Sequence, residues 1–202
     1  MNILKIDARN PQKKVIDQAV NTLSHGGIIM YPTDTCYGIG ADMSNSVAFK
    51  KVYELKKRSL TKPVSVIVPD LKYITNIAIV GNEQKKYLEK YLPGSVTLIL
   101  LTLDQNLFPF SSIGIRLPDY KITQMISQSF AYPYITTSAN ISNFPPAYEI
   151  KDFLNQLGQS DLKPDLILDA GILPKKELST VVNITNGTPK ILRQGSQKIE
   201  KL

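Results

Sequence analysis

The chain has 202 residues, of which 43% are hydrophobic and 20% are charged. This composition is typical of a globular protein and excludes a disordered tail, a coiled coil and a collagen-like fibre. No apolar run approaches the roughly 18 residues of a membrane-spanning helix, and the N-terminus lacks the pattern of a signal peptide. The single cysteine, Cys36, excludes an internal disulfide and favours a cytoplasmic protein. One Cys and one His cannot build an ordinary structural zinc site.

The formal net charge is +7, and most of this excess lies in the segment 50–62. The segment carries six Lys or Arg side chains and a single acidic one, Glu54. A concentrated positive field attracts phosphate, nucleotides or nucleic acid. The alternative is a solvated helix face that ends in a basic turn, and charge alone leaves both interpretations open.

The first part of the chain predicts a helix, a buried strand and a loop. Asn10 as the cap and Pro11 in the first turn would begin a helix with apolar residues at helical spacing. A short strand at 28–31 would then run into a loop at 32–40, which is rich in residues that favour turns. Ser46 would cap a second helix, with Val47, Ala48, Val52 and Leu55 facing inward.

Strands and helices alternate through the rest of the chain. The run 96–101 is continuously apolar, so it predicts a central strand buried on both faces. Asn186-Gly187 between two apolar runs predicts a hairpin of strands 180–184 and 190–193. The remaining predicted strands are 64–68, 113–117, 134–137 and 166–168, and the remaining helices begin near 81, 122 and 148. The fold class is therefore α/β, with a mixed sheet flanked by helices in a single domain.

Several common catalytic motifs are absent from the sequence. There is no P-loop, no complete dinucleotide-binding fingerprint and no G-x-S-x-G nucleophile motif. The only histidine, His25, stands at a predicted helix end, where it is expected to bind terminal carbonyls. Cys36 has no second histidine to activate it as a nucleophile. The sequence therefore argues against covalent or histidine-based catalysis.

Hydroxyl, amide and cationic side chains cluster at the ends of predicted strands instead. They occur at 33–35, 111–116, 136–140, 179–180 and at Arg193. Ligands of α/β proteins usually bind at the carboxyl edge of the sheet, where hydroxyls orient a polar ligand and cations neutralise phosphate. Each Ser or Thr alone is better explained as a turn or cap residue. Their joint placement predicts a polar ligand site without specifying a reaction.

Seven short motifs then occur in a fixed order. They are Tyr31-Pro32-Thr33-Asp34-Thr35-x-Tyr37-Gly38, Lys56-x-Arg58-x-x-x-Lys62-Pro63, Pro93-Gly94-x-x-Thr97, Gly114-x-Arg116-x-Pro118, Ser138-Ala139-Asn140-x-Ser142, Ser179-Thr180-Val181-Val182 and Ile191-x-Arg193-x-Gly195. Each motif alone is weak, but the ordered set covers about residues 10–195. By this ordered set of motifs, the chain resembles the YrdC-like family, the threonylcarbamoyl-AMP synthases.

The resemblance implies a fold and a reaction. The family fold is a twisted mixed sheet flanked by helices, with a concave basic cleft. Here it would occupy 1–202 without the extra C-terminal domain of longer members. Such nucleotidyltransferases condense L-threonine, bicarbonate and ATP into threonylcarbamoyl-AMP and pyrophosphate. Partner proteins then transfer the threonylcarbamoyl group to tRNA, as a step of tRNA processing. Mg²⁺ is expected on the triphosphate, without dedicated protein ligands.

The resemblance also implies residue roles. The catalytic set would be Lys56, Arg58, Ser138 and Asn140. ATP would be held by Arg58, Lys62, Ser112, Ser138 and Arg193, and Lys56, Arg58 and Lys62 would face its phosphates. L-Threonine would be held by Thr35, Arg116, Thr136 and Ser179. The implied chemistry needs no enzyme nucleophile, because catalysis would be positioning and charge stabilisation.

Three positions depart from the family pattern. Ile67 stands where many members have a histidine that contacts threonine, Asn143 replaces a glycine, and Pro146 replaces a serine near the nucleotide. Because the chain ends soon after Arg193, the tail Gly195–Leu202 is the segment expected to close the cleft.

Two other functions remain open at this point. One is a non-catalytic module of the same fold that binds tRNA or double-stranded RNA, which the net charge of +7 favours. The other is a carbamoyl-adenylate enzyme that uses carbamoyl phosphate, although such enzymes usually carry this unit inside much longer chains.

Overall fold

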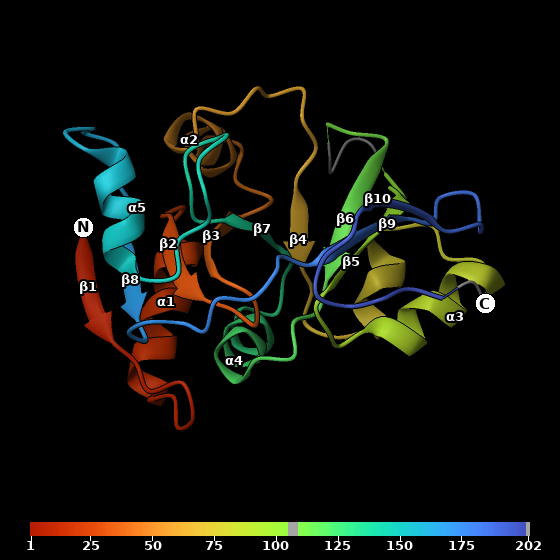
Figure 1. Ribbon diagram of the computed structural model, residues 1–202, viewed down its shortest axis with the longest axis horizontal. Coiled ribbons are helices and arrows are strands. Elements are labelled where there is room, and N and C mark those ends of the chain that lie inside the picture. The colour runs from red at the N-terminus through yellow and green to blue at the C-terminus, as the bar shows by residue number, and fades with distance from the viewer. Residues whose placement is uncertain (105–108, 201–202) are drawn as a thin grey trace.

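The computed structural model describes residues 1–104 and 109–200. Ten strands form one mixed sheet in the order β1-β8-β2-β3-β7-β4-β6-β5-β9-β10, flanked by helices (Figure 1). The strands are β1 (Asn2–Lys5), β2 (Ile29–Pro32), β3 (Tyr37–Asp42), β4 (Ser65–Ile67), β5 (Val96–Leu101), β6 (Ser112–Arg116), β7 (Tyr134–Ser138), β8 (Leu166–Asp169), β9 (Thr180–Asn183) and β10 (Lys190–Arg193). The helices are α1 (Lys13–Ser24), α2 (Ser46–Leu55), α3 (Asn82–Tyr91), α4 (Lys121–Phe130) and α5 (Ile150–Leu157), with a 3₁₀ turn, η1 (Lys72–Asn76). None of the helices in these described ranges has the length and apolarity needed to cross a membrane.

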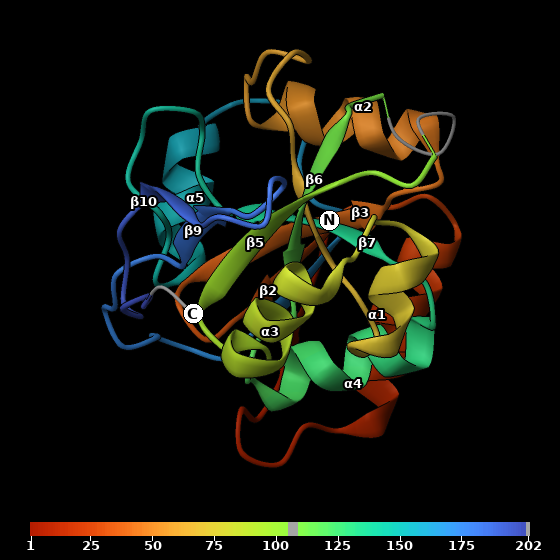
Figure 2. The ribbon, with the colours of Figure 1, turned by 90° about the vertical axis from the view of Figure 1, so that its right-hand side faces the viewer.

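The two faces of the sheet are covered differently. One face is covered over both of its halves. The helices α2 and α5 pack on one half of this face and enclose the core around Phe153. The elements α3 and η1 pack on the other half and enclose the core around Leu98. On the opposite face, α1 and α4 cover only the half that contains β2 and β7, around Tyr134. Figure 2 shows α3 lying beside β5, and it shows α1 and α4 farther from that strand. Within residues 1–104 and 109–200, no helix covers the rest of this opposite face, which comprises β5, β6, β9 and the parts of β4 and β7 at Ser65 and Thr136.

Side-chain alternation in the uncovered strands matches this arrangement. In β6, Ile113 and Ile115 point into the core, while Ser112, Gly114 and Arg116 point to the open face. In β5, Thr97 and Ile99 reach the open face, and Leu101 is 38% exposed. The expectation that 96–101 is buried on both faces is therefore wrong at Ile99 and Leu101, although Thr97 is buried. The strand is nonetheless internal to the sheet, as predicted.

Most predicted elements are confirmed, including the β9–β10 hairpin, and three local expectations are wrong. The segment 37–42 is a strand paired on both sides, with β2 and with β7, and not part of a loop. The first helix begins at Lys13, because Asp7 Oδ1 accepts from the backbone N–H of Asn10 and holds that residue in a preceding turn. Asn45 caps α2 in place of Ser46, which leaves Val47 exposed.

The C-terminal tail packs away from the open face. The Ser196 N–H donates to Leu178 O, and the Glu200 N–H donates to Tyr91 Oη at 2.8 Å on α3. Lys90 forms an ion pair with Glu200 at 2.8 Å, and Ile199 packs on the core beneath α3. The described tail residues 195–200 therefore do not lie over the cleft, and the expectation that they close it is wrong for them. Residues 201–202 lie outside the described part.

Candidate active site

A cleft of about 320 Å³ lies over the uncovered strands. Its floor is a row of small residues, since Thr136 pairs with Ser65 and Ser65 pairs with Gly114 across three strands. A Cβ at Gly114 would lie 2.5 Å from Ser65 Oγ, so a larger side chain there would fill the cleft. The lining residues are Thr33, Thr35, Cys36, Tyr37, Gly38, Arg58, Pro63, Val64, Ser65, Thr97, Ile99, Ser112, Gly114, Arg116, Thr136, Thr137, Ser138, Leu178, Ser179, Val181 and Arg193.

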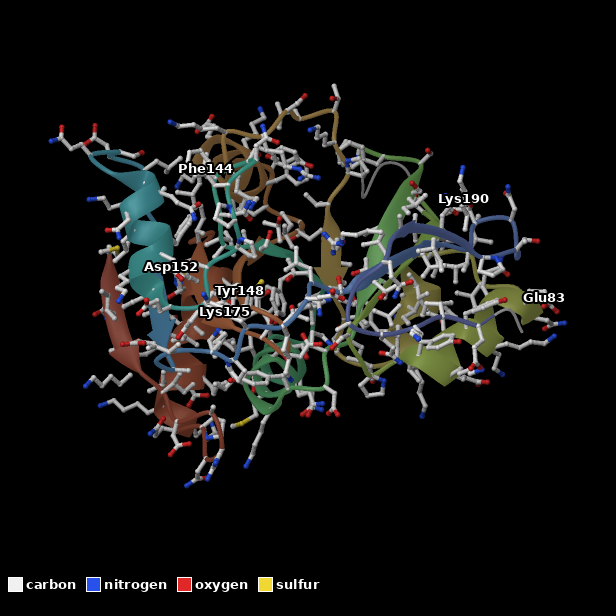
Figure 3. All side chains as sticks on the ribbon, viewed as in Figure 1. Glu83, Phe144, Tyr148, Asp152, Lys175 and Lys190 are labelled. Atoms are coloured by element: carbon white, nitrogen blue, oxygen red, sulfur yellow. The ribbon has the colours of Figure 1, made fainter. Side chains whose placement is uncertain are left out.

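Segments far apart in the sequence bring these residues together. The connection between β8 and β9 crosses the front of the molecule in Figure 1 and delivers Leu178 and Ser179. Figure 3 labels Tyr148 beside this connection, and Tyr148 Oη donates to Lys176 O at 2.7 Å. The same figure labels Phe144 near α2 and Lys190 on β10, on the two sides of the strands that form the cleft floor.

Arg116 is held at the end of β6 by an acidic partner. Its Nη2 donates to Asp34 Oδ1 at 2.8 Å, and Ser95 Oγ donates to Asp34 Oδ2 at 2.6 Å. The side chains of Arg116 and Asp34 are only 10% and 8% exposed. Arg116 Nε is buried without a hydrogen-bond partner in the described structure. Because Arg116 lines the cleft, its guanidinium places positive charge beside any ligand bound there.

Arg193 and Ser179 form a second unit at the start of β9. Arg193 Nε and Nη2 donate to Ser179 O at 3.1 and 2.8 Å, and the hydroxyls of Ser179 and Thr97 lie 2.9 Å apart. Burial, followed by the neighbouring Arg116 guanidinium, lowers the pKa of Arg193. Two guanidiniums therefore share this end of the cleft, which favours a ligand with negative charge.

Arg58 reaches the cleft from the loop after α2. Its Nη2 donates to Pro63 O at 2.8 Å, while its Nε is buried without a partner among the described residues. Tyr53 Oη donates to Lys62 O at 2.6 Å and fixes the same loop. Lys62 itself is exposed and does not line the cleft. Of the two ATP-binding cations predicted in this motif, the structure brings only Arg58 into the cleft.

Lys56 is buried below the cleft and does not line it. Its Nζ donates to Ser138 O, to Asn140 O at 2.7 Å and to Asn140 Oδ1 at 3.1 Å. Ser138 Oγ donates to the same Asn140 Oδ1 at 2.5 Å. Three oxygen acceptors match the three donors of an ammonium group. Burial, and then the Arg58 charge, lowers the pKa of Lys56 to about 7. Lys56 and Asn140 therefore support Ser138 from behind, and the prediction that Lys56 faces the phosphates is not met by this geometry.

The other predicted ligands lie on the cleft wall. Thr35, Ser112, Thr136, Ser138 and Ser179 all line it. Thr136 Oγ1 lies 2.7 Å from Tyr31 Oη, so a fully buried tyrosine fixes its rotamer. Ile67 is fully buried in the core beside Tyr134 and offers the cleft no polar group.

Sequence reasoning gave no ligand-binding role to Thr97, Ser65 or Gly114, although the ordered motifs contain Thr97 and Gly114. Thr97 lines the cleft because β5 has an open face. Ser65 and Gly114 form its floor. The alternation of polar or small residues with isoleucine across 112–116 is the signal that could have identified the open face. Asp34 is the only acidic residue in the polar segments 33–35, 111–116, 136–140 and 179–180. Its pairing with Arg116 has no local sequence signal.

His25 and Cys36 behave as structural residues. His25 follows α1, with Nδ1 2.8 Å from Asn21 O, which confirms the expected helix-end role. Cys36 is buried, and burial raises the pKa of its thiol to about 11. The described residues contain no group of three or more His, Cys, Asp or Glu side chains placed to hold a metal ion.

We expect Cys36 to be unreactive in the folded protein. Because its pKa is raised from 9.0 to about 11, its thiolate fraction at pH 8 falls roughly a hundredfold. Iodoacetamide labelling at pH 8 should therefore be at least that much slower in native than in urea-unfolded protein. Cys36→Ser should keep most activity, and near-total loss would support a covalent mechanism instead.

The fold and the cleft define an α/β protein with a polar, cationic ligand cleft over uncovered strands. A family model for the Sua5/YciO/YrdC domain, described as telomere recombination, matches residues 21–195. The chain belongs to the Sua5/YciO/YrdC family.

Named relatives cover nearly the whole chain. A Methanocaldococcus jannaschii protein, provisionally named threonylcarbamoyl-AMP synthase, is 34% identical over 99% of this chain and 96% of its own length. The Bos taurus threonylcarbamoyl-AMP synthase is 34% identical over 93% of this chain and 72% of its own length.

Two solved structures share the fold. P. abyssi Sua5 complexed with L-threonine matches with a TM-score of 0.87 and 23% identity, over 96% of this chain and 58% of its own. E. coli YciO matches with a TM-score of 0.86 and 24% identity, over 98% of both chains. At these identities the structural matches establish the fold alone.

Proposed function

We propose that this protein is an L-threonylcarbamoyladenylate synthase, a nucleotidyltransferase. The observation that carries the proposal is the convergence of three arginines and several hydroxyls on one cleft in a chain whose relatives include enzymes named threonylcarbamoyl-AMP synthase. A cationic polar cleft suits a polyphosphate and an amino acid bound side by side. Its described lining contains no histidine, and its one cysteine has a raised pKa.

The reaction balances without an enzyme nucleophile. The amine of L-threonine takes up carbon dioxide derived from bicarbonate and loses a proton, which gives a carbamate. A carbamate oxygen then attacks the α-phosphorus of ATP, and the bond to the bridging oxygen breaks as pyrophosphate leaves. The products are threonylcarbamoyl-AMP, pyrophosphate and the water that bicarbonate loses when it gives carbon dioxide. The protein must hold two anionic reactants in line, and such positioning supplies on the order of 7–11 kcal/mol.

The cleft supports a division of roles. Arg58 and Arg193 carry no carboxylate partner in the described part of the chain, so we assign them to ATP, with Ser112 and Ser138. Arg116, Thr35, Thr136 and Ser179 would hold L-threonine. Mg²⁺ would arrive on the triphosphate, since magnesium usually keeps phosphate and water ligands with few protein ones. The described residues show no carboxylate cluster that would hold it by themselves.

The product implies a wider context. A threonylcarbamoyl-adenylate is an activated intermediate, so we propose that transfer proteins of tRNA modification consume it in the cytoplasm. The second candidate is RNA binding without catalysis. It is favoured by the exposed Lys50, Lys51, Lys57 and Lys62, which lie on α2 and in the segment that follows it. Such binding through phosphates would weaken steeply with salt.

Pyrophosphate release from ATP tests the two candidates. We expect release that requires both L-threonine and bicarbonate and that L-serine supports poorly. Release should be lost in Ser138→Ala, whereas RNA binding should survive that change. No release under any combination, with salt-sensitive RNA binding intact, would favour the non-catalytic function and remove the catalytic assignments.

Replacing Arg58 by alanine should raise the KM for ATP far more than the KM for L-threonine. Arg58 lines the cleft and donates only to a backbone oxygen in the described part of the protein, and a hydrogen bond to a charged group is worth about 1.5–3 kcal/mol, which corresponds to roughly ten- to hundredfold in KM. Steady-state kinetics with each substrate varied in turn would measure this. Lys51→Ala removes the same charge from an exposed position on α2 and should change neither constant. A larger effect on L-threonine would remove Arg58 from the phosphate role.

A further inference from the structure

Asp34 is the one acidic side chain bound to a cleft arginine in the described part of the chain. Both of its oxygens are occupied, one by Arg116 Nη2 at 2.8 Å and the other by Ser95 Oγ at 2.6 Å. The carboxylate is 8% exposed, so solvent screens its charge only weakly. It therefore contributes a fixed negative charge behind the guanidinium of Arg116.

The other two cleft arginines have a different environment. Arg58 donates to the backbone oxygen of Pro63, and Arg193 donates to the backbone and hydroxyl oxygens of Ser179. Neutral oxygens leave the charge of both guanidiniums uncompensated. The cleft thus has one charge-balanced position, at Arg116 with Asp34, and two positions with net positive charge.

We propose that Asp34 is a specificity-determining residue, which makes the Arg116 position select an amino acid carboxylate and reject phosphate. This rests on the proposed function, because it assigns Arg116 to L-threonine. Arg116 lines the cleft, and together with Asp34 it forms a pair without net charge, which suits a monovalent carboxylate. Phosphate or carbamoyl phosphate would bring a second negative charge close to Asp34, and like charges at such distances repel strongly in a partly buried site. The Arg116–Asp34 pair would therefore reject phosphate at the same position where it recognises an amino acid carboxylate.

Competition by inorganic phosphate tests this proposal without any catalytic turnover. In the wild type, phosphate should weaken the binding of ATP and leave the Kd of L-threonine, measured by titration calorimetry, unchanged. Asp34→Asn keeps the shape and removes the charge. In this variant phosphate should bind roughly tenfold more tightly and displace L-threonine, while the Kd of L-threonine measured without phosphate should change much less. A merely structural role would weaken both ligands together.

Further variants keep the test decisive. Asp34→Glu retains the charge and should still reject phosphate, even where L-threonine binds more weakly. If phosphate displaces L-threonine from the wild type, the proposal is overturned. This wild-type result is sufficient even where Asp34→Asn does not fold. Unchanged phosphate affinity in folded Asp34→Asn overturns it as well. A wild type that binds no L-threonine counts instead against the proposed function, and direct phosphate titration of wild type and Asp34→Asn still decides the role of Asp34.

Discussion

Replacing Lys56 by methionine should lower both the stability and the kcat of this protein. Methionine fills a similar volume but leaves Ser138 O, Asn140 O and Asn140 Oδ1 without their shared donor. An unsatisfied buried acceptor costs about 1–3 kcal/mol, so a loss of about 2–4 kcal/mol in the free energy of unfolding is expected. Because Ser138 lines the cleft, its displacement should reduce kcat by roughly a hundredfold.

Urea unfolding and steady-state kinetics of the same preparation would measure both effects. Lys62→Met is the matched control, since it removes the same charge from an exposed side chain of the same motif and should leave stability unchanged. A Lys56→Met protein with wild-type stability and a raised KM for ATP would contradict the buried geometry. It would show that the lysine contacts the phosphates.

The case of Lys56 illustrates what the sequence could and could not predict. The motif Lys56-x-Arg58 places two cations two residues apart, and nothing in that spacing says which of them is buried. The answer depends on contacts with Ser138 and Asn140, more than 80 residues away in the sequence. Because α2 ends at Leu55, Lys56 continues beneath the β7 loop while Arg58 lies further along, at the cleft.

The prediction of a loop where 37–42 forms a strand is wrong for a related reason. The glycines and polar residues in and around this segment have the composition of a loop. The glycines are required for a different reason, because large aromatic rings pack directly on the strand. A Cβ at Gly40 would lie 2.9 Å from the ring of Tyr31 and 3.1 Å from that of Tyr134. Local composition therefore indicates a turn where tertiary packing requires a strand.

The elements with strong local signals were predicted well. The hairpin at Asn186-Gly187, the helix after Gly81 and the apolar strand at 96–101 all rest on neighbouring residues. The cleft residues were located by motif order, but their partners were not, since Asp34 and Arg116 are 82 positions apart. Which face of β5 lies open depends on where the helices pack, and a single strand does not encode that.

Replacing Gly195 by alanine should destabilise the protein strongly, by about 3 kcal/mol or more. A Cβ at this position would overlap Leu178 O and would lie 2.7 Å from Ser179 C and 2.8 Å from Thr180 N. All three atoms belong to the backbone, so no side-chain rotation relieves the overlap. The tail and the start of β9 must separate, which breaks the bond from the Gly195 N–H to Thr180 Oγ1.

The same change should disturb the cleft, because Ser179 and its partner Arg193 flank this contact. We expect lost L-threonine binding even at temperatures where Gly195→Ala remains folded. Gly171→Ala is the control: Gly171 has a φ of 77°, and no described atom lies within 4 Å of the methyl group that alanine would add, so only a conformational penalty of about 1–2 kcal/mol applies. Thermal melting of both variants separates steric overlap from backbone preference. Equal melting temperatures would contradict the close passage of the tail against Leu178, whereas a much lower value for Gly195→Ala would identify the tail as the support of this side of the cleft.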